Sequence, residues 1–218
     1  MKTISIFGGT GFIGTELLNQ LADTPYKIQL FTRNKKKLSQ IKPKPRLELI
    51  EFSTNSSLLK KLNRSDVIIN LVGILHETKE IKFSMAHEDF VSKLIKSALK
   101  KNIKRLIHIS ALGVSKASSS NYLCSKYKAE LIIKNKFKVS DWTILRPSIV
   151  FGHNDKFINL FKILVRFLPV IFLVSPKSEF QPIHVEDLVD IIVKSINDKK
   201  TFKKAFNLGG PKKFTFYE

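Results

Sequence analysis

The chain has 218 residues, of which 43% are hydrophobic, so it can bury a substantial core as one domain or as one domain with a small lobe. Its single cysteine, Cys124, excludes an internal disulfide and a multi-cysteine metal site, and we predict no metal site. The formal net charge of +20 indicates solvated surface lysines, an anionic membrane surface or acidic partner, or nucleic acid. The sequence has neither a signal-peptide pattern nor an apolar run of about 18 residues, so we expect a cytoplasmic protein.

The first segment of interest, residues 4–14 (I-S-I-F-G-G-T-G-F-I-G), predicts a buried strand, a glycine turn and the start of an amphipathic helix. Three of its four glycines, Gly8, Gly11 and Gly14, fall three residues apart. Glycine allows the tight turn and the close approach of a pyrophosphate, while the N–H groups at the helix start bind phosphate. We therefore predict a dinucleotide site, with an ordinary strand-to-helix turn as the alternative.

The second predicted strand, residues 27–32, ends beside Arg33, nineteen positions after Gly14. An NAD-specific site carries Asp or Glu near this position for the ribose 2′-hydroxyl, whereas Thr32 and Arg33 stand here. A guanidinium pairs with a 2′-phosphate, so the sequence favours NADP(H) over NAD(H). The alternative is a solvated arginine at the end of a strand.

Strands and helices alternate through the rest of the chain. Further strands are predicted at 47–52, 67–71, 104–110, 142–150, 180–185 and 205–210, and helices at 58–62, 83–101, 121–136 and 188–196. This alternation predicts an α/β fold, a Rossmann-type doubly wound parallel sheet with helices on both faces. We expect an NAD(P)-binding domain over 1–152, followed over 153–218 by a small, truncated substrate or partner lobe and a returning Rossmann strand.

Two residues of the helix at 121–136, Tyr122 and Lys126, are four positions apart and therefore share one face. In such a pair the ammonium lowers the pKa of the phenol, which then exchanges a proton with a carbonyl or an alcohol. The alternative is a surface tyrosine and lysine on a lysine-rich helix.

The segment Phe157–Val174 is predicted to begin as a helix with a wide apolar face and a polar stripe that includes Lys162 and Arg166. This pattern suits an interfacial helix on a membrane surface or docking on a partner, and burial within the same molecule is the alternative. The other lysines are scattered along the chain and no RNA- or DNA-binding motif accompanies them, which argues against nucleic acid.

Seven motifs stand in a fixed order: G-G-T-G-F-I-G (8–14), N-L-V-G (70–73), I-S-A-L-G (109–113), Y-L-C-S-K-Y-K-A-E (122–130), L-R-P-S-I-V-F-G (145–152), F-Q-P-I-H-V-E-D-L (180–188) and N-L-G-G-P (207–211). Together they resemble the extended or atypical short-chain dehydrogenase/reductase superfamily. Within it, the sequence is most similar to the NADPH-binding accessory subunits of respiratory complex I and their bacterial relatives. The resemblance covers essentially the whole chain.

The resemblance implies a role for each matching position. The pyrophosphate would be held by Gly8, Thr10, Gly11, Phe12, Ile13 and Gly14, and the 2′-phosphate would be contacted by Arg33. The cofactor would be lined by Asn70, Leu71, Val72 and Gly73 and by Ser110, and its carboxamide end approached by Pro147, Ser148 and Ile149. Lys126 would contact the nicotinamide ribose and Tyr122 would be the acid/base.

The sequence also departs from the pattern of active members of this superfamily. In those members a Ser or Thr that holds the substrate oxygen follows the fifth strand. The matching positions of this chain are Ala111 and Leu112, and Ser110 is out of register. Glu51 stands in for the adenine-contacting acid of the third strand. The resemblance thus implies an NADPH held structurally in a subunit of a respiratory complex, peripheral on the bacterial inner membrane or on the equivalent matrix face.

Two other functions remain open. One is an active NAD(P)-dependent oxidoreductase or sugar-nucleotide epimerase/dehydratase that uses Tyr122 and Lys126, with a substrate pocket near His184. The other is a basic nucleic-acid-binding module, which rests on net charge alone.

Overall fold

The computed structural model describes residues 1–33, 46–52, 62, 65–153, 155 and 179–215. The helix predicted at 58–62 lies outside these residues except for Leu62, and the interfacial segment Phe157–Val174 lies outside them entirely.

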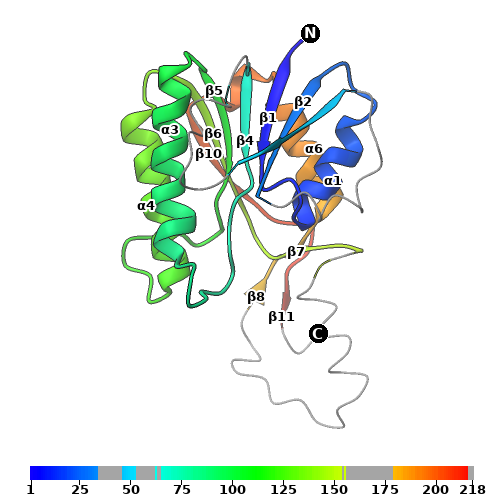
Figure 1. Cartoon of the computed structure of the whole chain (residues 1–218). Helices are drawn as coiled ribbons and strands as arrows, with labels where there is room; N and C mark the ends of the chain where they lie inside the picture. The colour runs from blue at the N-terminus through cyan, green and yellow to red at the C-terminus, as the bar shows by residue number, and fades with distance from the viewer. Residues whose placement is uncertain (34–45, 53–61, 63–64, 154, 156–178, 216–218) are drawn as a thin grey trace.

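A seven-stranded sheet forms the middle layer of the molecule, in the order β10-β6-β5-β4-β1-β2-β3 (Figure 1). Every neighbouring pair in it is parallel. The strands are β1 (Thr3–Phe7), β2 (Lys27–Thr32), β3 (Leu47–Glu51), β4 (Val67–Asn70), β5 (Arg105–Ile109), β6 (Asp141–Pro147) and β10 (Lys204–Leu208). Strand order reverses between β1 and β4, and such a switch point at the carboxyl ends is where open α/β sheets bind ligands.

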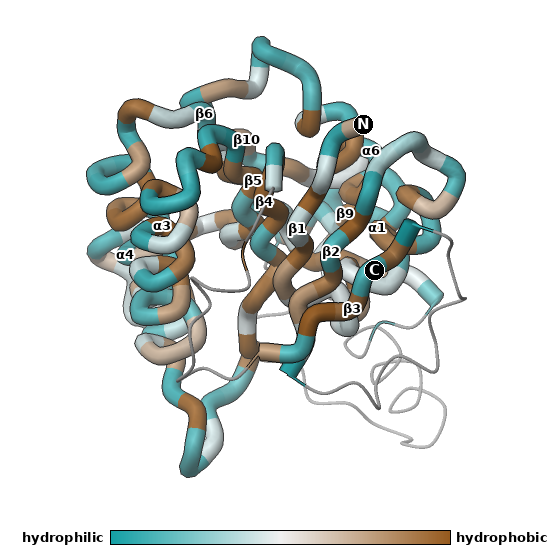
Figure 2. Tube along the Cα trace, turned by 45° about the horizontal axis from the view of Figure 1, so that its top comes forward, coloured by the Kyte–Doolittle hydropathy of each residue, from teal (hydrophilic) through white to brown (hydrophobic). Residues whose placement is uncertain are grey.

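Helices cover both faces of this sheet. On one face lie α3 (Phe90–Lys100) and α4 (Asn121–Lys136), and on the other lie α1 (Phe12–Leu21) and α6 (Val185–Ser195) (Figure 1). The central strand β4 is apolar up to Asn70 because both of its faces are buried, and Figure 2 shows hydrophobic residues along the strands in the middle of the molecule. The predicted Rossmann-type α/β fold is confirmed.

Alternate residues of β1 contribute to two separate cores. Ile4 and Ile6 of β1 pack with Leu17 of α1 and Leu188 of α6. Phe7 points to the other face, where its ring lies 4.5 Å from that of Phe31 and joins the core under α3 and α4. This period of two is the expected geometry of a strand covered on both sides.

Several element boundaries differ from those predicted. The helix at 83–101 opens with a π-helical turn, η2 (Ser84–Asp89), before α3. The strand at 142–150 ends at Pro147, and Val150–Phe151 form a separate short strand, β7, that pairs with β9 (Ile183–His184). The piece at 180–185 is likewise interrupted, because β8 (Glu179–Phe180) pairs instead with β11 (Phe214–Thr215).

The last helix of the described chain, α6, begins at Val185 rather than at residue 188. The Nδ1 atom of His184 accepts a hydrogen bond from the backbone N–H of Glu186 at 3.4 Å, and Glu186 and Asp187 occupy the first turn. A capping acceptor and two carboxylates stabilise the start of a helix, which explains the longer span. His184 therefore acts as a helix cap, and a short helical turn, η3 (Lys199–Thr201), follows α6 before β10.

Candidate nucleotide-binding site

The glycine turn after β1 leaves the start of α1 open to an anion. The N-cap of α1 is Gly11, no side chain caps this end, and no acidic residue occupies the first turn. By contrast, Ser120 caps α4 and His184 caps α6. Uncapped N–H groups and the positive end of a helix dipole together attract phosphate.

Close packing explains two of the three glycines that are spaced three residues apart. Gly8 has a φ of +79°, and a Cβ there would lie 2.8 Å from the carbonyl carbon of Leu71. A Cβ on Gly14 would lie 2.4 Å from the Cα of Gly9. The turn is thus pressed between α1 and the chain that leaves β4, with the glycines at the points of closest approach.

Gly11 has a different environment. Its backbone is extended (φ −88°, ψ 178°), and a Cβ there would meet only the carbonyl oxygen of Gly8, at 3.3 Å. The side of the turn that Gly11 faces is therefore open, as the approach of a pyrophosphate requires.

Arg33 follows the carboxyl end of β2, the strand next to β1. Its side chain is exposed and forms no salt bridge with an acidic residue of the described chain. An exposed guanidinium beside the glycine turn suits the predicted contact with a 2′-phosphate, which stays a prediction.

The residue that ends β4, Asn70, is fixed by two hydrogen bonds. Its Oδ1 accepts from the backbone N–H of Val72 at 3.0 Å, so its Nδ2 must donate to Nδ1 of His108 on β5, 3.1 Å away. His108 consequently carries its proton on Nε2. The segment 70–73 is held in a defined shape against the glycine turn, since the N–H of Leu71 also donates to the carbonyl of Phe7 at 2.9 Å.

Two buried polar atoms lie at the end of β5, one on His108 itself and one on Ser110, the residue after the strand. Nε2 of His108 has no hydrogen-bond partner among the described residues, and Oγ of Ser110 makes no regular hydrogen bond there either. Burial, and then the charge of Lys126, lower the pKa of His108 to about 3, so its ring is neutral.

Lys126 is almost completely buried, with 4% of its surface exposed. Its Nζ donates to the carbonyl of Ile109 at 3.1 Å and would lie 3.1 Å from a Cβ on Gly73. Burial lowers the pKa of Lys126 to about 8, and the nearby charge of Glu130 partly opposes that shift. The ammonium thus sits between the end of β5 and the predicted cofactor-lining segment.

Glu130 anchors the same helix to β6. Its fully buried carboxylate accepts from Nε and Nη2 of Arg146 at 2.8 and 2.6 Å and from Nζ of Lys134 at 3.1 Å. Burial by itself raises the pKa of Glu130, but the hydrogen bonds from Arg146 and Lys134, together with the charge of Arg146, bring it below the usual value. The carboxylate is therefore charged, and it fixes Arg146 next to the predicted site residue Pro147.

Tyr122 differs from the sequence-based expectation. Its ring packs edge-on against Phe83 and His87, with centroids 5.7 and 5.6 Å away. Burial raises the pKa of its phenol, and the charge of Lys126 does not offset this effect. The expected lowering of the pKa of Tyr122 by Lys126 is thus wrong.

Backbone hydrogen bonds place Pro147, Ser148 and Ile149 at the carboxyl edge of the sheet. The carbonyl of Pro147 accepts from Leu112, the N–H of Ser148 donates to Leu208, and the carbonyl of Ile149 accepts from Ile183, at 2.8–2.9 Å. All the predicted site segments therefore lie at the edge where parallel strands end: 8–14, 33, 70–73, 110 and 147–149. Lys126 contacts this edge from α4.

Sequence reasoning did not identify His87, His108 or Glu130. Glu130 continues the four-residue spacing of Tyr122 and Lys126, so that spacing could have indicated it. Nothing in the local sequence marks the π-helical turn that carries His87. Among the described residues, no group of three or more His, Cys, Asp or Glu side chains could hold a metal ion, and no helix is long and apolar enough to cross a membrane.

Comparison with known proteins agrees with this geometry. The family described as NAD(P)H-binding matches residues 8–199. The subunit 9 of the NADH dehydrogenase [ubiquinone] 1 alpha subcomplex from Arabidopsis thaliana is 31% identical, over 98% of this chain and 55% of that protein. The 40 kDa subunit of NADH-ubiquinone oxidoreductase from Neurospora crassa is 26% identical, over 99% of this chain and 58% of that protein. The chain thus spans little more than half the length of these curated relatives.

Among solved structures, the UDP-glucuronic acid 4-epimerase from Bacillus cereus, in complex with NAD, superposes with a TM-score of 0.84. The match covers 99% of this chain and 80% of the epimerase at 20% identity, which establishes a common fold. The chain thus has the fold of the extended short-chain dehydrogenase/reductase epimerases, and its relatives include complex I subunits. It belongs to the NAD(P)H-binding family.

Proposed function

We propose that the protein holds one NADP(H) molecule at the glycine turn, and that the bound nucleotide stabilises it as a subunit of a membrane-associated respiratory complex. The observation that carries this proposal is the start of α1, which lies at the switch point of the sheet, has no side-chain cap and has no acidic residue in its first turn. A dinucleotide pyrophosphate supplies the charge that this helix end lacks. A ligand bound only to the folded state also stabilises it by mass action.

The preference for NADP(H) over NAD(H) rests on Arg33. An exposed arginine follows β2, where an NAD-specific site carries an acidic side chain. A 2′-phosphate would form charge-assisted hydrogen bonds with this guanidinium, which a 2′-hydroxyl cannot match.

A binding role without turnover is supported by two features of the catalytic region. The pKa of Tyr122 is raised by burial, so the phenol holds its proton tightly. Ala111 and Leu112 offer no hydroxyl group to a substrate oxygen where active superfamily members carry Ser or Thr. Nicotinamide chemistry would come from the bound nucleotide, and here Tyr122 and Lys126 would serve to position it.

The proposed partners are respiratory subunits and a membrane surface, because the Arabidopsis relative is named as a subunit of NADH dehydrogenase [ubiquinone] and the Neurospora relative as a subunit of NADH-ubiquinone oxidoreductase. We place the protein in the cytoplasm, peripheral on the inner membrane, or on the equivalent matrix face. Docking through Phe157–Val174 rests on the sequence alone. Co-sedimentation with anionic liposomes should weaken in the double variant Lys162→Glu/Arg166→Glu, and unchanged binding would contradict docking through this segment.

Mass spectrometry of the nucleotide released from the purified protein tests the binding role. The proposal predicts NADP⁺ or NADPH close to one per chain, together with respiratory subunits in a pull-down from the native membrane fraction. Recovery of NAD⁺ alone would contradict the nucleotide preference, and recovery of no dinucleotide would contradict the binding role.

A second candidate, an oxidoreductase or epimerase, is favoured by the position of Lys126 at the carboxyl edge on the same helix as Tyr122. A relative from Vibrio cholerae named UDP-glucose 4-epimerase is 24% identical over 94% of this chain. Steady-state NADPH-dependent turnover that disappears in Tyr122→Phe would establish this function and exclude the purely structural one.

A further inference from the structure

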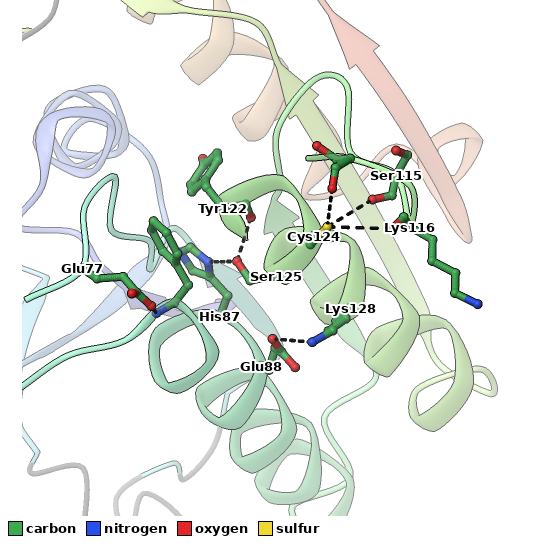
Figure 3. A network of polar contacts seen from close by, with 11 residues as sticks. Glu77, His87, Glu88, Ser115, Lys116, Tyr122, Cys124, Ser125 and Lys128 are labelled. Atoms are coloured by element: carbon green, nitrogen blue, oxygen red, sulfur yellow. Dashed lines mark hydrogen bonds and ion pairs between the residues drawn. The ribbon is translucent and has the colours of Figure 1, made fainter. Parts of the chain in front are cut away.

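A chain of three hydrogen bonds joins the segment after β4 to helix α4 through His87. The backbone N–H of Ile74 donates to Nε2 of His87 at 3.2 Å, and Nδ1 of His87 lies 2.7 Å from Oγ of Ser125. The hydroxyl of Ser125 donates in turn to the backbone carbonyl of Tyr122 at 2.7 Å, as the dashed lines in Figure 3 show for the last two contacts.

The direction of each hydrogen bond in this chain can be assigned. A backbone N–H only donates, so Nε2 of His87 accepts and the ring proton lies on Nδ1. Ser125 then accepts from Nδ1–H, and its own proton goes to the carbonyl of Tyr122. His87 and His108 are therefore opposite tautomers, with the proton on Nδ1 in His87 and on Nε2 in His108.

His87 also lies against Tyr122, the predicted acid/base, and next to the segment that is predicted to line the cofactor. Its ring is 1% exposed, stacks on Phe83 and packs edge-on against Tyr122. A Cβ on Gly73 would lie 3.6 Å from Nε2 of His87 and 3.1 Å from Nζ of Lys126. One side chain therefore contacts both the cofactor-lining segment and the start of α4.

The backbone that carries His87 is unusual. It lies in the π-helical turn η2, a conformation found mostly as single turns and frequently at functional sites. Burial, and then the charge of Lys126, lower the pKa of His87 to about 3, which agrees with a neutral ring that accepts a hydrogen bond at Nε2.

We propose that His87 is a positioning residue: in its neutral Nδ1–H form it locks the Gly73–Ile74 segment and the Tyr122 end of α4 together around the nicotinamide half of the nucleotide. The inference rests on the proposed nucleotide binding. It predicts that His87 contributes to the binding only of the nicotinamide half of the nucleotide, beyond the pyrophosphate.

Two ligands separate this role from general stabilisation. NADPH contains the nicotinamide half, whereas adenosine 2′,5′-bisphosphate contains only the adenosine half with its 2′-phosphate. In His87→Phe, which keeps an aromatic ring against Phe83 and Tyr122 but removes both hydrogen bonds, affinity for NADPH should fall about tenfold. Affinity for adenosine 2′,5′-bisphosphate should stay within about twofold of the unsubstituted protein.

Companion variants keep the test decisive if His87→Phe folds poorly. His87→Gln supplies an acceptor and a donor at the end of its side chain and should recover most of the NADPH affinity. Ser125→Ala breaks the last two links and should weaken NADPH selectively as well. The matched control is His76→Phe, because His76 is an exposed histidine of the loop between β4 and η2, and it should change neither affinity.

Nitrogen NMR of the imidazole rings gives a readout that is independent of nucleotide. The imidazole signals of the unsubstituted protein that disappear in His87→Gln belong to His87. At pH 7 they should show the proton on Nδ1, and the signals of His108 should show it on Nε2. Equal weakening of both ligands, unchanged NADPH affinity, or an Nε2–H tautomer at His87 would each overturn the positioning role. If the unsubstituted protein does not bind NADPH, the proposed function itself is contradicted. The tautomer of His87 then still tests the hydrogen-bond chain from which its positioning role is inferred.

Discussion

The guanidinium of Arg146 forms two parallel hydrogen bonds to the fully buried carboxylate of Glu130, at 2.8 and 2.6 Å. This pair ties α4, which carries Tyr122 and Lys126, to the end of β6, which continues into Pro147. A bidentate pair fixes geometry as well as charge, so the two sides of the candidate site are held in one register.

Removal of the Glu130 charge should destabilise the fold. In Glu130→Gln, Arg146 and Lys134 lose the buried anion, and we expect the free energy of unfolding to fall by about 3 kcal/mol. Urea denaturation at pH 7 measures this loss. Asp23→Asn, the same chemical change at an exposed position, should cost less than about 0.5 kcal/mol, and similar losses in both variants would contradict the role of Glu130.

Two glycine substitutions should separate folding from binding. The extended backbone of Gly11 is one that any residue adopts, so the melting temperature should change little in Gly11→Ala. NADPH affinity should nevertheless fall at least about tenfold, because the new methyl group occupies the space through which the pyrophosphate approaches. Gly14→Ala places a methyl group 2.4 Å from the Cα of Gly9 and should lower both stability and affinity. Thermal unfolding and a fluorescence titration measure the two effects. Full NADPH affinity in Gly11→Ala would contradict the assignment of this turn to the pyrophosphate.

Acid should destabilise the protein through its buried histidines. The pKa values of His87 and His108 are lowered to about 3, whereas an unfolded histidine titrates near 6.5. Below pH 6.5 the unfolded chain therefore binds protons that the folded chain excludes, and stability falls as pH drops toward 3, by about 1 kcal/mol per pH unit for each histidine. Urea unfolding at pH 7, 6 and 5 measures this slope.

One histidine variant checks that assignment. In His108→Gln the slope of stability against pH should become shallower by about 1 kcal/mol per pH unit, because one of the two excluded protons is gone. A slope equal to that of the unsubstituted protein would show that His108 is not buried in neutral form.

The sequence predicts the elements that local patterns define. The bounds of β2 (Lys27–Thr32) and α4 (Asn121–Lys136) match the prediction, because a strand in which apolar and polar residues alternate at its start and a helix with a serine cap are encoded within or next to their own residues. The glycine spacing likewise predicts the turn after β1, since steric contacts within a few residues require it.

Features that depend on distant partners could not be predicted in this way. The strand predicted at 142–150 ends at Pro147 because Ser148 donates to Leu208 and Ile149 accepts from Ile183, residues far along the chain. The π-helical turn at His87 accompanies contacts with Ile74 and Ser125 from two other segments. The raised pKa of Tyr122 follows from burial under Phe83 and His87, which helix spacing alone does not reveal.

Tyr122→Phe distinguishes binding from catalysis. If Tyr122 only packs beside the nicotinamide, its hydroxyl contributes little, and NADPH affinity should stay within about threefold. No NADPH oxidation should be detected above background in either protein with carbonyl or UDP-sugar substrates. Turnover in the unsubstituted protein that the variant loses would favour the oxidoreductase or epimerase function.

The central claim, that Arg33 and the glycine turn hold NADP(H), is tested most directly by equilibrium titration of the unsubstituted protein and Arg33→Glu with NADPH and NADH. We predict that the unsubstituted protein prefers NADPH, and that Arg33→Glu weakens NADPH by about tenfold to a hundredfold while NADH changes by less than about threefold. Lys104→Glu, an exposed charge reversal at the amino edge of the sheet, should change neither affinity. Equal loss of both nucleotides in Arg33→Glu, or equal affinity for both in the unsubstituted protein, would contradict the account.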